Sequence, residues 1–266
     1  MDANYQGLFY FIEKSIEKKK QLFEVSAIRY FIRAMLATLF LTLGTAIAVI
    51  TAQAAEKAIP GSGKFSYSFM FSWSLVMIIY MNAELGTSNM MYATVGVHRK
   101  LLSGKKALII LFSCLLFNLI GGILASYLVS LSSVFQDLPT DHFLFHAIEG
   151  KLAKSPLQIF TEGIFANIIV NVAVFCTIRM KDDAGKVISM IFIIFIFAFL
   201  GFEHVIANFA SFPLAFFAYG GAVPGMTLAS VATNWLLAAL GNFVGGGLII
   251  GLTYSWLNKG NHIYLD

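Results

Sequence analysis

Few ionisable residues interrupt the apolar parts of this sequence. Glu84, Glu162, Glu203 and His204 each stand inside or beside a long apolar run. His204 is the group among them that changes charge near neutral pH, so a proton and an anion could meet there. A neutral structural histidine is the alternative interpretation. By residue type, three acids and a histidine fit a cation or proton path at least as well as an anion path.

The three glutamates are more easily explained by structural roles than by direct contact with a substrate. Glu84 and Glu203 are predicted to accept hydrogen bonds from free backbone N–H groups beside them, and Glu162 is predicted to support helix packing. Thr87 and Ser88 could offer hydroxyl groups to a substrate or cap the helix that follows. Both interpretations of the hydroxyls stay open.

An intramembrane enzyme would need a different arrangement. Glu203 and His204 could form an acid and base pair, but adjacent residues on a helix point about 100 degrees apart. No nucleophile or metal-ligand motif accompanies them. The sequence therefore predicts no enzyme activity, no cofactor and no metal.

These residues lie in a chain whose composition belongs in a bilayer. Of the 266 residues, 58% are hydrophobic and 12% are charged, and the mean hydropathy is +0.79, which is too apolar for a soluble domain of this length. A membrane helix needs about 20 apolar residues, so the length leaves room for roughly six helices. The prediction is an all-α integral membrane protein. Nothing in the sequence supports nucleic acid binding.

Six apolar runs can be drawn, and two of them are interrupted. The second run breaks at residues 84–89 and the fifth at residues 201–208. Non-helical backbone at membrane depth is tolerated only where protein buries it or where it lines a cavity, so the two breaks point at a pathway. The runs cover residues 32–52, 65–97, 107–131, 157–178, 187–213 and 226–257.

The two halves of the chain also look alike. The third run contains an Asn-x-x-Gly-Gly motif from Asn118 to Gly122, and the sixth run contains another from Asn242 to Gly246. Three spans per half give the halves opposite orientations, which predicts an inverted 3+3 repeat with its site near the bilayer midplane. Ordinary small-residue helix contacts would explain the glycines equally well.

Charge distribution predicts the orientation. If both termini are cytoplasmic, 14 of the 18 lysines and arginines lie on the inner side and four on the outer side, which obeys the positive-inside rule. The four outer residues are Lys57, Lys64, Lys151 and Lys154.

Three segments follow from this topology. Residues 1–26 lack a cleavage site and are predicted to form a cytoplasmic amphipathic helix on the membrane surface, with a frayed tail as the alternative. Residues 27–258 form the membrane domain, and residues 259–266 form a cytoplasmic tail.

Three separated segments resemble, in order, the signature segments of the formate/nitrite transporter family: residues 83–89, 201–208 and 241–248. Residues 151–167 and 251–256 are also similar to the family, so the resemblance spans nearly the whole chain. It implies an aquaporin-like fold, a homopentamer with one pore per protomer, and a bacterial-type inner membrane.

The resemblance also implies site residues. His204 matches the central pore histidine, Thr87 the threonine of the broken second helix, and Lys151 the lysine of the outer vestibule. The remaining expected roles are two pore-side asparagines, Asn167 and Asn242; one apolar constriction of Phe71, Phe197 and Val170; a second of Leu75 and Leu85; and broken-helix supports at Glu84, Glu203, Gly86, Ser88 and Asn208.

Gly86 departs from the family pattern, which usually has a bulky residue before the threonine. Glycine is predicted to loosen or reshape the inner loop, so that Gly86→Phe would alter transport without affecting assembly. Lys151 is predicted to attract anions to the outer mouth, and Lys154 to matter much less.

The resulting hypothesis is a channel or transporter for small monovalent weak-acid anions, proton-linked through His204. Formate and nitrite come first, followed by lactate, acetate and hydrosulfide. The expected partners are the lipid bilayer, these anions and protons. A neutral-solute or proton channel of the same architecture is the alternative.

Overall fold

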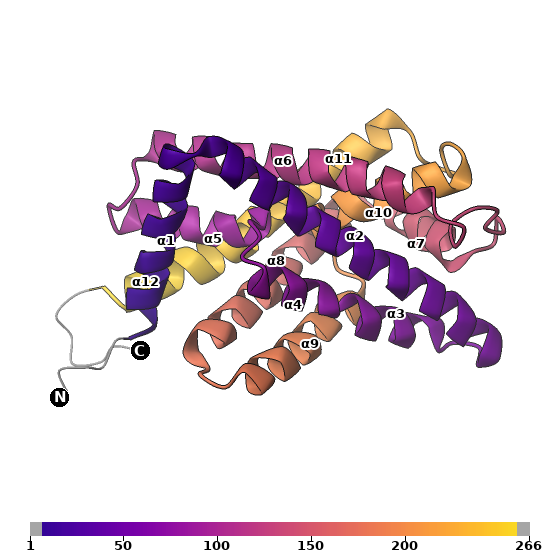
Figure 1. Ribbon diagram of the computed structural model, residues 1–266, viewed down its shortest axis with the longest axis horizontal. Helices are drawn as coiled ribbons and strands as arrows, with labels where there is room; N and C mark the ends of the chain where they lie inside the picture. Colours follow the sequence, from indigo (N-terminus) through magenta and orange to yellow (C-terminus); the bar gives the residue numbers. More distant parts are fainter. Residues whose placement is uncertain (1–6, 260–266) are drawn as a thin grey trace.

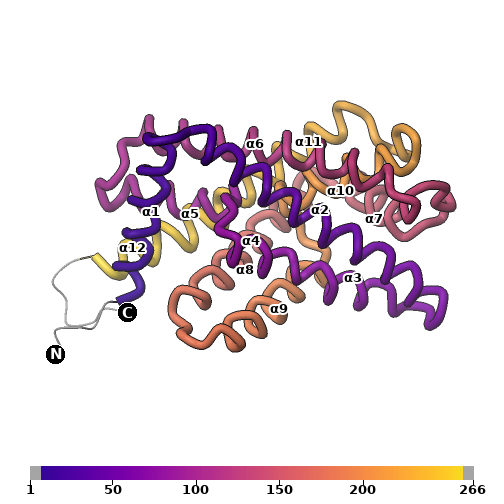
Figure 2. The backbone as a smooth tube through the Cα atoms, in the orientation of Figure 1, coloured from indigo at the N-terminus to yellow at the C-terminus, as the bar shows by residue number. Residues whose placement is uncertain are grey.

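The computed structural model describes residues 7–259, and every regular element in that range is a helix. Figures 1 and 2 show the longer helices running roughly along the long axis of the molecule, while the N-terminal helix crosses it at one end. In the first half they are α1 (Leu8–Val25), α2 (Ala27–Ala58), α3 (Gly63–Phe71), α4 (Trp73–Tyr80), α5 (Gly86–His98) and α6 (Gly104–Ser130). In the second half they are α7 (Phe143–Leu152), α8 (Pro156–Arg179), α9 (Asp183–Leu200), α10 (Val205–Tyr219), α11 (Leu228–Asn242), the π-helix η1 (Phe243–Leu252) and α12 (Thr253–Leu257).

Within the described range, five helices are long and apolar enough to cross a membrane. They are α2, α6, α8, α9 and the continuous helix formed by α11, η1 and α12. Large apolar side chains stand exposed on their outer surfaces, as at Leu108, Phe112 and Phe192, each about two-thirds exposed. A lipid-facing surface needs no polar cover, so this exposure fits a bilayer.

Both predicted interruptions are present, but with different bounds: the first covers residues 81–85 and the second residues 201–204, so that residues 86–89 and 205–208 are already helical. The first lies between the end of α4 at Tyr80 and the start of α5 at Gly86, where Asn82 has a φ of 50°. The second lies between α9 and α10, where Gly201 ends α9 in the left-handed region with a φ of 75°. Glycine suits this position because it adopts a positive φ without steric cost. The chain therefore turns out of helical geometry twice among buried residues.

The two halves make equivalent helix contacts. Helix α6 packs against both α2 and α10, while the continuous helix from α11 to η1 packs against both α8 and α5. The glycines of the predicted Asn-x-x-Gly-Gly motifs lie at these crossings: a Cβ atom on Gly121 would come within 2.5 Å of the Met35 backbone, and one on Gly245 would collide with the carbonyl oxygen of Ile164. Small residues thus let the backbones approach closely.

The N-terminal helix differs from its prediction in one respect. Its apolar stripe is the one expected, with Leu8, Phe9, Ile12 and Ile16 all buried. These side chains pack on α5, α8 and η1 instead of lying on lipid, because the inner ends of those helices present an apolar surface of their own. Residues 1–6 and 260–266, which belong to the predicted N-terminal segment and tail, lie outside the described residues.

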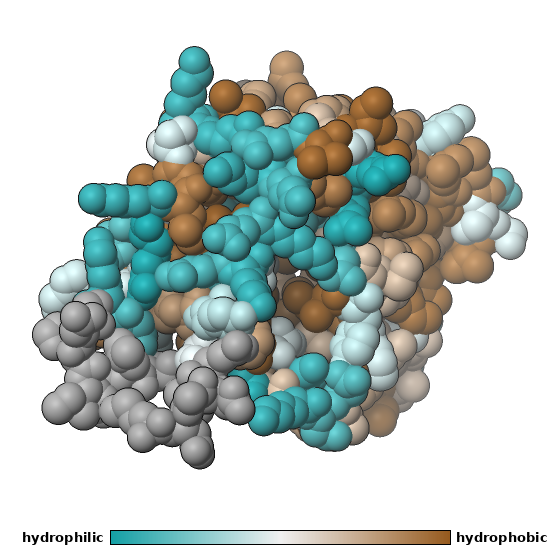
Figure 3. Space-filling model, turned by 60° about the vertical axis from the view of Figure 1, so that its left-hand side comes forward, coloured by the Kyte–Doolittle hydropathy of each residue, from teal (hydrophilic) through white to brown (hydrophobic). Residues whose placement is uncertain are grey.

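Polar residues gather at one end of the bundle. Figure 1 shows α1, α12 and the connection from α5 to α6 together at the left, with α7 and the connection from α2 to α3 at the opposite end. When that left-hand side is turned forward, Figure 3 shows hydrophilic residues covering it and hydrophobic residues on the flank. The end of the bundle that carries α1 and α12 is therefore hydrophilic.

Cysteine labelling can test the orientation. In a cysteine-free background, single cysteines between Arg99 and Lys106 should react with a membrane-impermeant reagent only after the inner side is exposed, because positive loops stay cytoplasmic. A cysteine at Lys57 should react from outside. External labelling of the Arg99 to Lys106 segment in intact cells would contradict the topology.

Candidate functional site

A single hydrogen bond joins the two helix breaks. Thr87 Oγ1 and His204 Nε2 lie 2.8 Å apart, and both side chains are buried. The other ring nitrogen, Nδ1, accepts a hydrogen bond of 3.1 Å from the backbone N–H of Ala207 and so caps the start of α10. An accepting Nδ1 carries no proton, which places the ring proton on Nε2 as a donor toward Thr87.

Two asparagines satisfy the backbone at the breaks. The Oδ1 atom of Asn118 accepts from Gly86 N at 2.9 Å, and its amide nitrogen donates to the carbonyl oxygens of Glu84 at 3.0 Å and Ala34 at 2.6 Å. Without such partners these buried backbone groups would each cost several kcal/mol.

Asn242 does the same for the second break. Its Oδ1 atom accepts from Val205 N at 2.9 Å, and its amide nitrogen donates to the carbonyl oxygens of Glu203 at 2.9 Å and Gly163 at 2.7 Å. Sequence reasoning used Asn118 only as a sign of the repeat. The matching Asn-x-x-Gly-Gly motifs were the signal that could have assigned it this role.

The prediction for the two glutamates was wrong about their partners. Glu84 Oε2 accepts from Lys19 Nζ at 2.6 Å and from Asn89 Nδ2 at 2.9 Å. These are side-chain donors and not the backbone N–H groups expected, because Asn118 already bonds the backbone there. Sequence reasoning missed Lys19, which comes from α1, 65 residues away.

Glu203 is fully buried and is held by two lysines. Its Oε1 atom lies 3.2 Å from Lys151 Nζ and 2.7 Å from Lys154 Nζ. The second oxygen, Oε2, accepts from Asn208 at 2.7 Å and Asn234 at 3.3 Å. Four donors thus surround this buried carboxylate and offset the cost of its burial. Asn208 thus supports the second break, as expected for a helix-break residue.

Lys154, which was predicted to matter much less than Lys151 for attracting anions, makes more contacts than Lys151 does. It also donates to Glu162 at 2.5 Å and to the carbonyl oxygen of Gly201 at 2.7 Å. Glu162 therefore serves an ion pair and not only helix packing. Although burial opposes the charge, Glu203 and Glu162 raise the pKa of Lys154 above its ordinary value. In the same way Glu84 outweighs burial and raises the pKa of Lys19.

Asn167 links the site across the bundle. Its amide nitrogen donates to the carbonyl oxygens of Thr87 at 3.0 Å and Asn242 at 2.7 Å, and its oxygen accepts from Asn171. Asn167 and Asn242 were both expected to face the pore. In the structure their amides bond to backbone, and they hold Thr87 and His204 in place.

The predicted constriction residues line one small cavity. Phe71, Leu75, Leu85, Val170 and Phe197 all border a space of about 20 Å³ that also touches His204. Such a space holds about one water molecule. The sequence assigned these five residues to two constrictions, but the packing of α3 and α4 beside α9 brings them around a single space.

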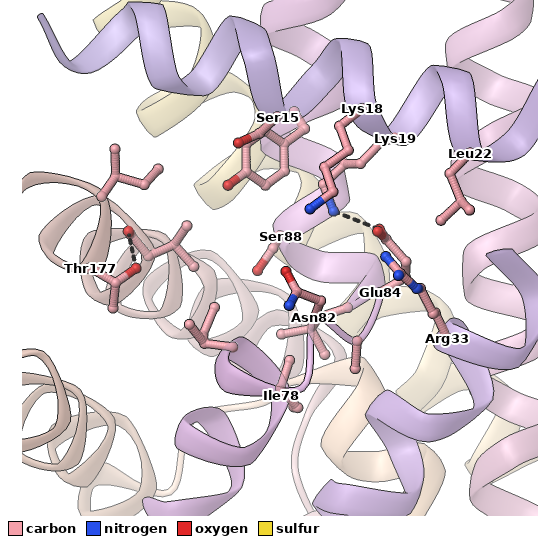
Figure 4. A pocket seen from close by; sticks show the side chains of 16 residues that line it. Ser15, Lys18, Lys19, Leu22, Arg33, Ile78, Asn82, Glu84, Ser88 and Thr177 are labelled. Atoms are coloured by element: carbon pink, nitrogen blue, oxygen red, sulfur yellow. Dashed lines mark hydrogen bonds and ion pairs between the residues drawn. The ribbon is translucent and has the colours of Figure 1, made fainter. Parts of the chain in front are cut away.

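A larger vestibule opens on the side of α1. Its volume is about 290 Å³, and Leu85 and Ser88 form part of its wall. Leu85 and Ile78 border both the vestibule and the small cavity, so these two side chains lie between the two spaces. Figure 4 shows Lys18 and Lys19 reaching into this vestibule from above, with Ser88 and Asn82 facing them.

Gly86 does not loosen the first break. Its N–H bonds to Asn118, and a Cβ atom there would come 2.7 Å from Leu115 Cδ2 and 2.8 Å from Asn118 Oδ1. Real Cβ atoms do not approach other atoms so closely, so glycine allows α6 to come near. The expectation of a looser loop was wrong because the space around Gly86 is already filled.

Metal binding has no support in this part of the chain. Among residues 7–259, no group of three or more His, Cys, Asp or Glu side chains could hold a metal ion.

Comparison with known proteins identifies the family. The family model described as formate/nitrite transporter matches residues 9–256 of the chain. This chain belongs to the formate/nitrite transporter family. It is accordingly a multi-pass integral membrane protein that takes part in transport and is not an enzyme.

Relatives cover the chain to different extents. The uncharacterized transporter YwcJ of Bacillus subtilis is 30% identical over 247 residues, which are 93% of this chain and 96% of YwcJ. Formate-nitrite transporter 3 of Toxoplasma gondii is 31% identical over 93% of this chain, but the match spans only 49% of the Toxoplasma protein.

Two solved structures share the fold. An "FNT family ion channel" superposes with a TM-score of 0.87, at 22% identity, over 95% of this chain and 99% of the other. A "pentameric formate channel with formate bound" superposes with a TM-score of 0.74, at 23% identity, over 88% of this chain and 98% of the other. The chain thus shares its overall fold with both of these structures.

We expect Lys154→Ala to destabilise this family member more than Lys151→Ala. Lys154 makes the shorter contact with Glu203 and two further hydrogen bonds, and each bond to a charged group contributes about 1.5–3 kcal/mol. Thermal unfolding in detergent, followed by size-exclusion chromatography, measures the difference. Equal unfolding temperatures for the two variants would refute this ranking.

Gly86→Ala should lower the thermal stability and the assembled fraction, and Gly86→Phe should lower them further, because Leu115 and Asn118 must move. Gly104→Ala is the matched control, since no atom lies within 4 Å of a Cβ atom at that helical position. A fully assembled and stable Gly86→Phe protein would instead restore the earlier expectation that this position only tunes transport.

Proposed function

We propose that this protein is a channel or transporter for small monovalent weak-acid anions, with formate or nitrite as the leading substrates. The observation that carries the proposal is the buried bond between His204 Nε2 and Thr87 Oγ1, beside an apolar cavity of about 20 Å³. A polar pair in an apolar space of this size suits a small solute with one hydrogen-bonding end. The relatives named as formate-nitrite transporters support the same substrate class.

Charge at the two mouths supports an anionic substrate. Lys19 lies beside the vestibule near Glu84, and Lys151 and Lys154 lie beside Glu203 at the opposite end of the bundle. Positive groups raise the local concentration of anions. Between the mouths the apolar walls oppose a bare charge, so the anion needs a donor or a proton there.

His204 supplies that donor. Its Nε2–H, now directed at Thr87, can be redirected to a carboxylate or nitrite oxygen that enters the cavity. Because Nδ1 is already bonded to Ala207 N, full protonation of the ring would break the cap of α10. We therefore assign His204 a shared proton with the passing weak acid, and this sharing links transport to protons.

Six spans arranged as an inverted 3+3 repeat, of the aquaporin-like kind, are part of the proposal. Three pairs of residues make equivalent contacts in the two halves: Glu84 and Glu203, Asn89 and Asn208, Asn118 and Asn242. On this proposal α3 and α4 with α5 are the second span, α9 with α10 are the fifth, and residues 27–258 form one channel domain.

Assembly and location follow from the family. A solved neighbour is titled a pentameric formate channel, and we propose a homopentamer for this chain. The positive end that carries α1 and α12 would face the cytoplasm of a bacterial-type inner membrane, with Lys57 and Lys151 outside.

Flux measurements in proteoliposomes test the function. A panel of formate, nitrite, lactate, acetate and hydrosulfide should show saturable uptake of at least one anion that depends on external pH. Liposomes without protein provide the baseline flux. Fast glycerol flux beside formate uptake that ignores pH would favour a neutral-solute channel instead.

His204→Asn should assemble normally but lose the pH dependence of the flux. Asparagine is a good helix N-cap, so it preserves the bond to α10 while removing the imidazole that would share a proton with the passing acid. Oligomer size and formate flux at two pH values must be measured on one preparation. A well-assembled variant with wild-type pH dependence would overturn the proton link and leave the channel assignment standing.

A further inference from the structure

The vestibule is far larger than a transported anion requires. Its volume of about 290 Å³ corresponds to about ten times the volume share of one water molecule in the liquid. Residues from α1, α2, α4, α5 and α8 enclose it, so parts of the chain far apart in sequence build it together. Figure 4 shows polar side chains of several of these helices pointing toward its centre.

Positive charge in the vestibule exceeds negative charge. Lys18, Lys19 and Arg33 line it together with one carboxylate, that of Glu84, which leaves a net charge of three minus one, or plus two. Glu84 is bonded to Lys19 at 2.6 Å. Within residues 7–259, neither Lys18 nor Arg33 has a carboxylate at ion-pair distance.

The two uncompensated cations stand on different helices. Lys18 belongs to α1, and Arg33 belongs to α2, whose backbone carbonyl at Arg33 accepts from Glu84 N at 3.0 Å. That bond fixes Arg33 at the first helix break. Two cations held on separate helices around a shared space form the donor arrangement that an anion with two charged ends would need.

Ser88 provides an independent sign of a ligand. Its Oγ atom is buried without a hydrogen-bond partner, and the residue is only 6% exposed while lining the vestibule. A buried hydroxyl without a partner is unfavourable, so a ligand that accepted a hydrogen bond from it would be stabilised. It lies in the first turn of α5, where backbone N–H groups also favour negative charge.

We propose that this vestibule binds a small dianionic oxyanion, held by Lys18 and Arg33 with a hydrogen bond from Ser88 Oγ. A dianion balances the two uncompensated charges, which a single formate or nitrite ion does not. It is too highly charged to enter the apolar cavity of about 20 Å³ beyond Leu85. Since the vestibule is the inner end of the proposed pathway, the bound dianion blocks anion flux from that side, and this blocking role rests on the proposed function.

Binding can be measured without any transport. Equilibrium dialysis of the purified protein in detergent with radiolabelled sulfate, at constant ionic strength in sodium chloride, should give one saturable site per chain. The double variant Lys18→Gln with Arg33→Gln should bind at least tenfold more weakly, and Ser88→Ala several-fold more weakly. Lys20→Gln, which removes the same charge from the same helix but lines a different hollow, should stay within twofold of wild type.

Flux then tests the consequence. When sulfate is sealed inside proteoliposomes, it should slow formate flux through the channels whose vestibule faces the lumen, and the inhibition should saturate. Formate flux through the double variant should be much less sensitive to sulfate. Succinate and inorganic phosphate are tested in the same way. Their relative potency as inhibitors of formate flux shows whether the site prefers a dicarboxylate or a phosphate-type dianion. If Lys20→Gln weakens binding as much as the double variant does, or if wild type binds no sulfate while formate flux is normal, the proposed site is overturned. Sulfate binding with no anion flux under any condition would refute the proposed function and leave the site standing.

Discussion

Buried backbone groups need partners, and the rest of this structure depends on how that need is met at two helix breaks. In the apolar interior an unbonded N–H or C=O group costs several kcal/mol, so a broken helix survives there only with an internal substitute. Asn118 and Asn242 are those substitutes: the oxygen of each accepts from one backbone N–H at its break, and the amide nitrogen donates to one carbonyl oxygen of the break and to one of a neighbouring helix. Both are fully buried, and their helices pack through glycines close to the backbones they serve.

The buried carboxylates at the two breaks also need partners. Glu84 and Glu203 sit at the breaks, and the lysines that neutralise them come from segments outside the spans, α1 for Lys19 and the end of α7 with its following turn for Lys151 and Lys154. The ion pairs fasten these short segments to the core. Because each lysine offsets a buried or half-buried carboxylate, little uncompensated charge from these groups remains beside the breaks.

Sequence alone determined the class, the helical content and the location of both breaks. Apolar run length and interruption are local properties, so residues 84–89 and 201–208 could be recognised before any packing was known. The types of His204 and Thr87 and the three family segments pointed to the candidate site. The buried face of α1 was also correct, because helical periodicity fixes which residues share a face.

Tertiary structure decided which residues meet. Thr87 and His204 are 117 residues apart, and Lys19 and Glu84 are 65 apart, so no local pattern could pair them. The same holds for the role of Lys154, the tight surroundings of Gly86 and the merging of two expected constrictions into one cavity. Each depends on how closely whole helices approach, and that distance is set by the summed packing of side chains from many segments. A sequence shows which groups are available, whereas the folded chain selects their partners.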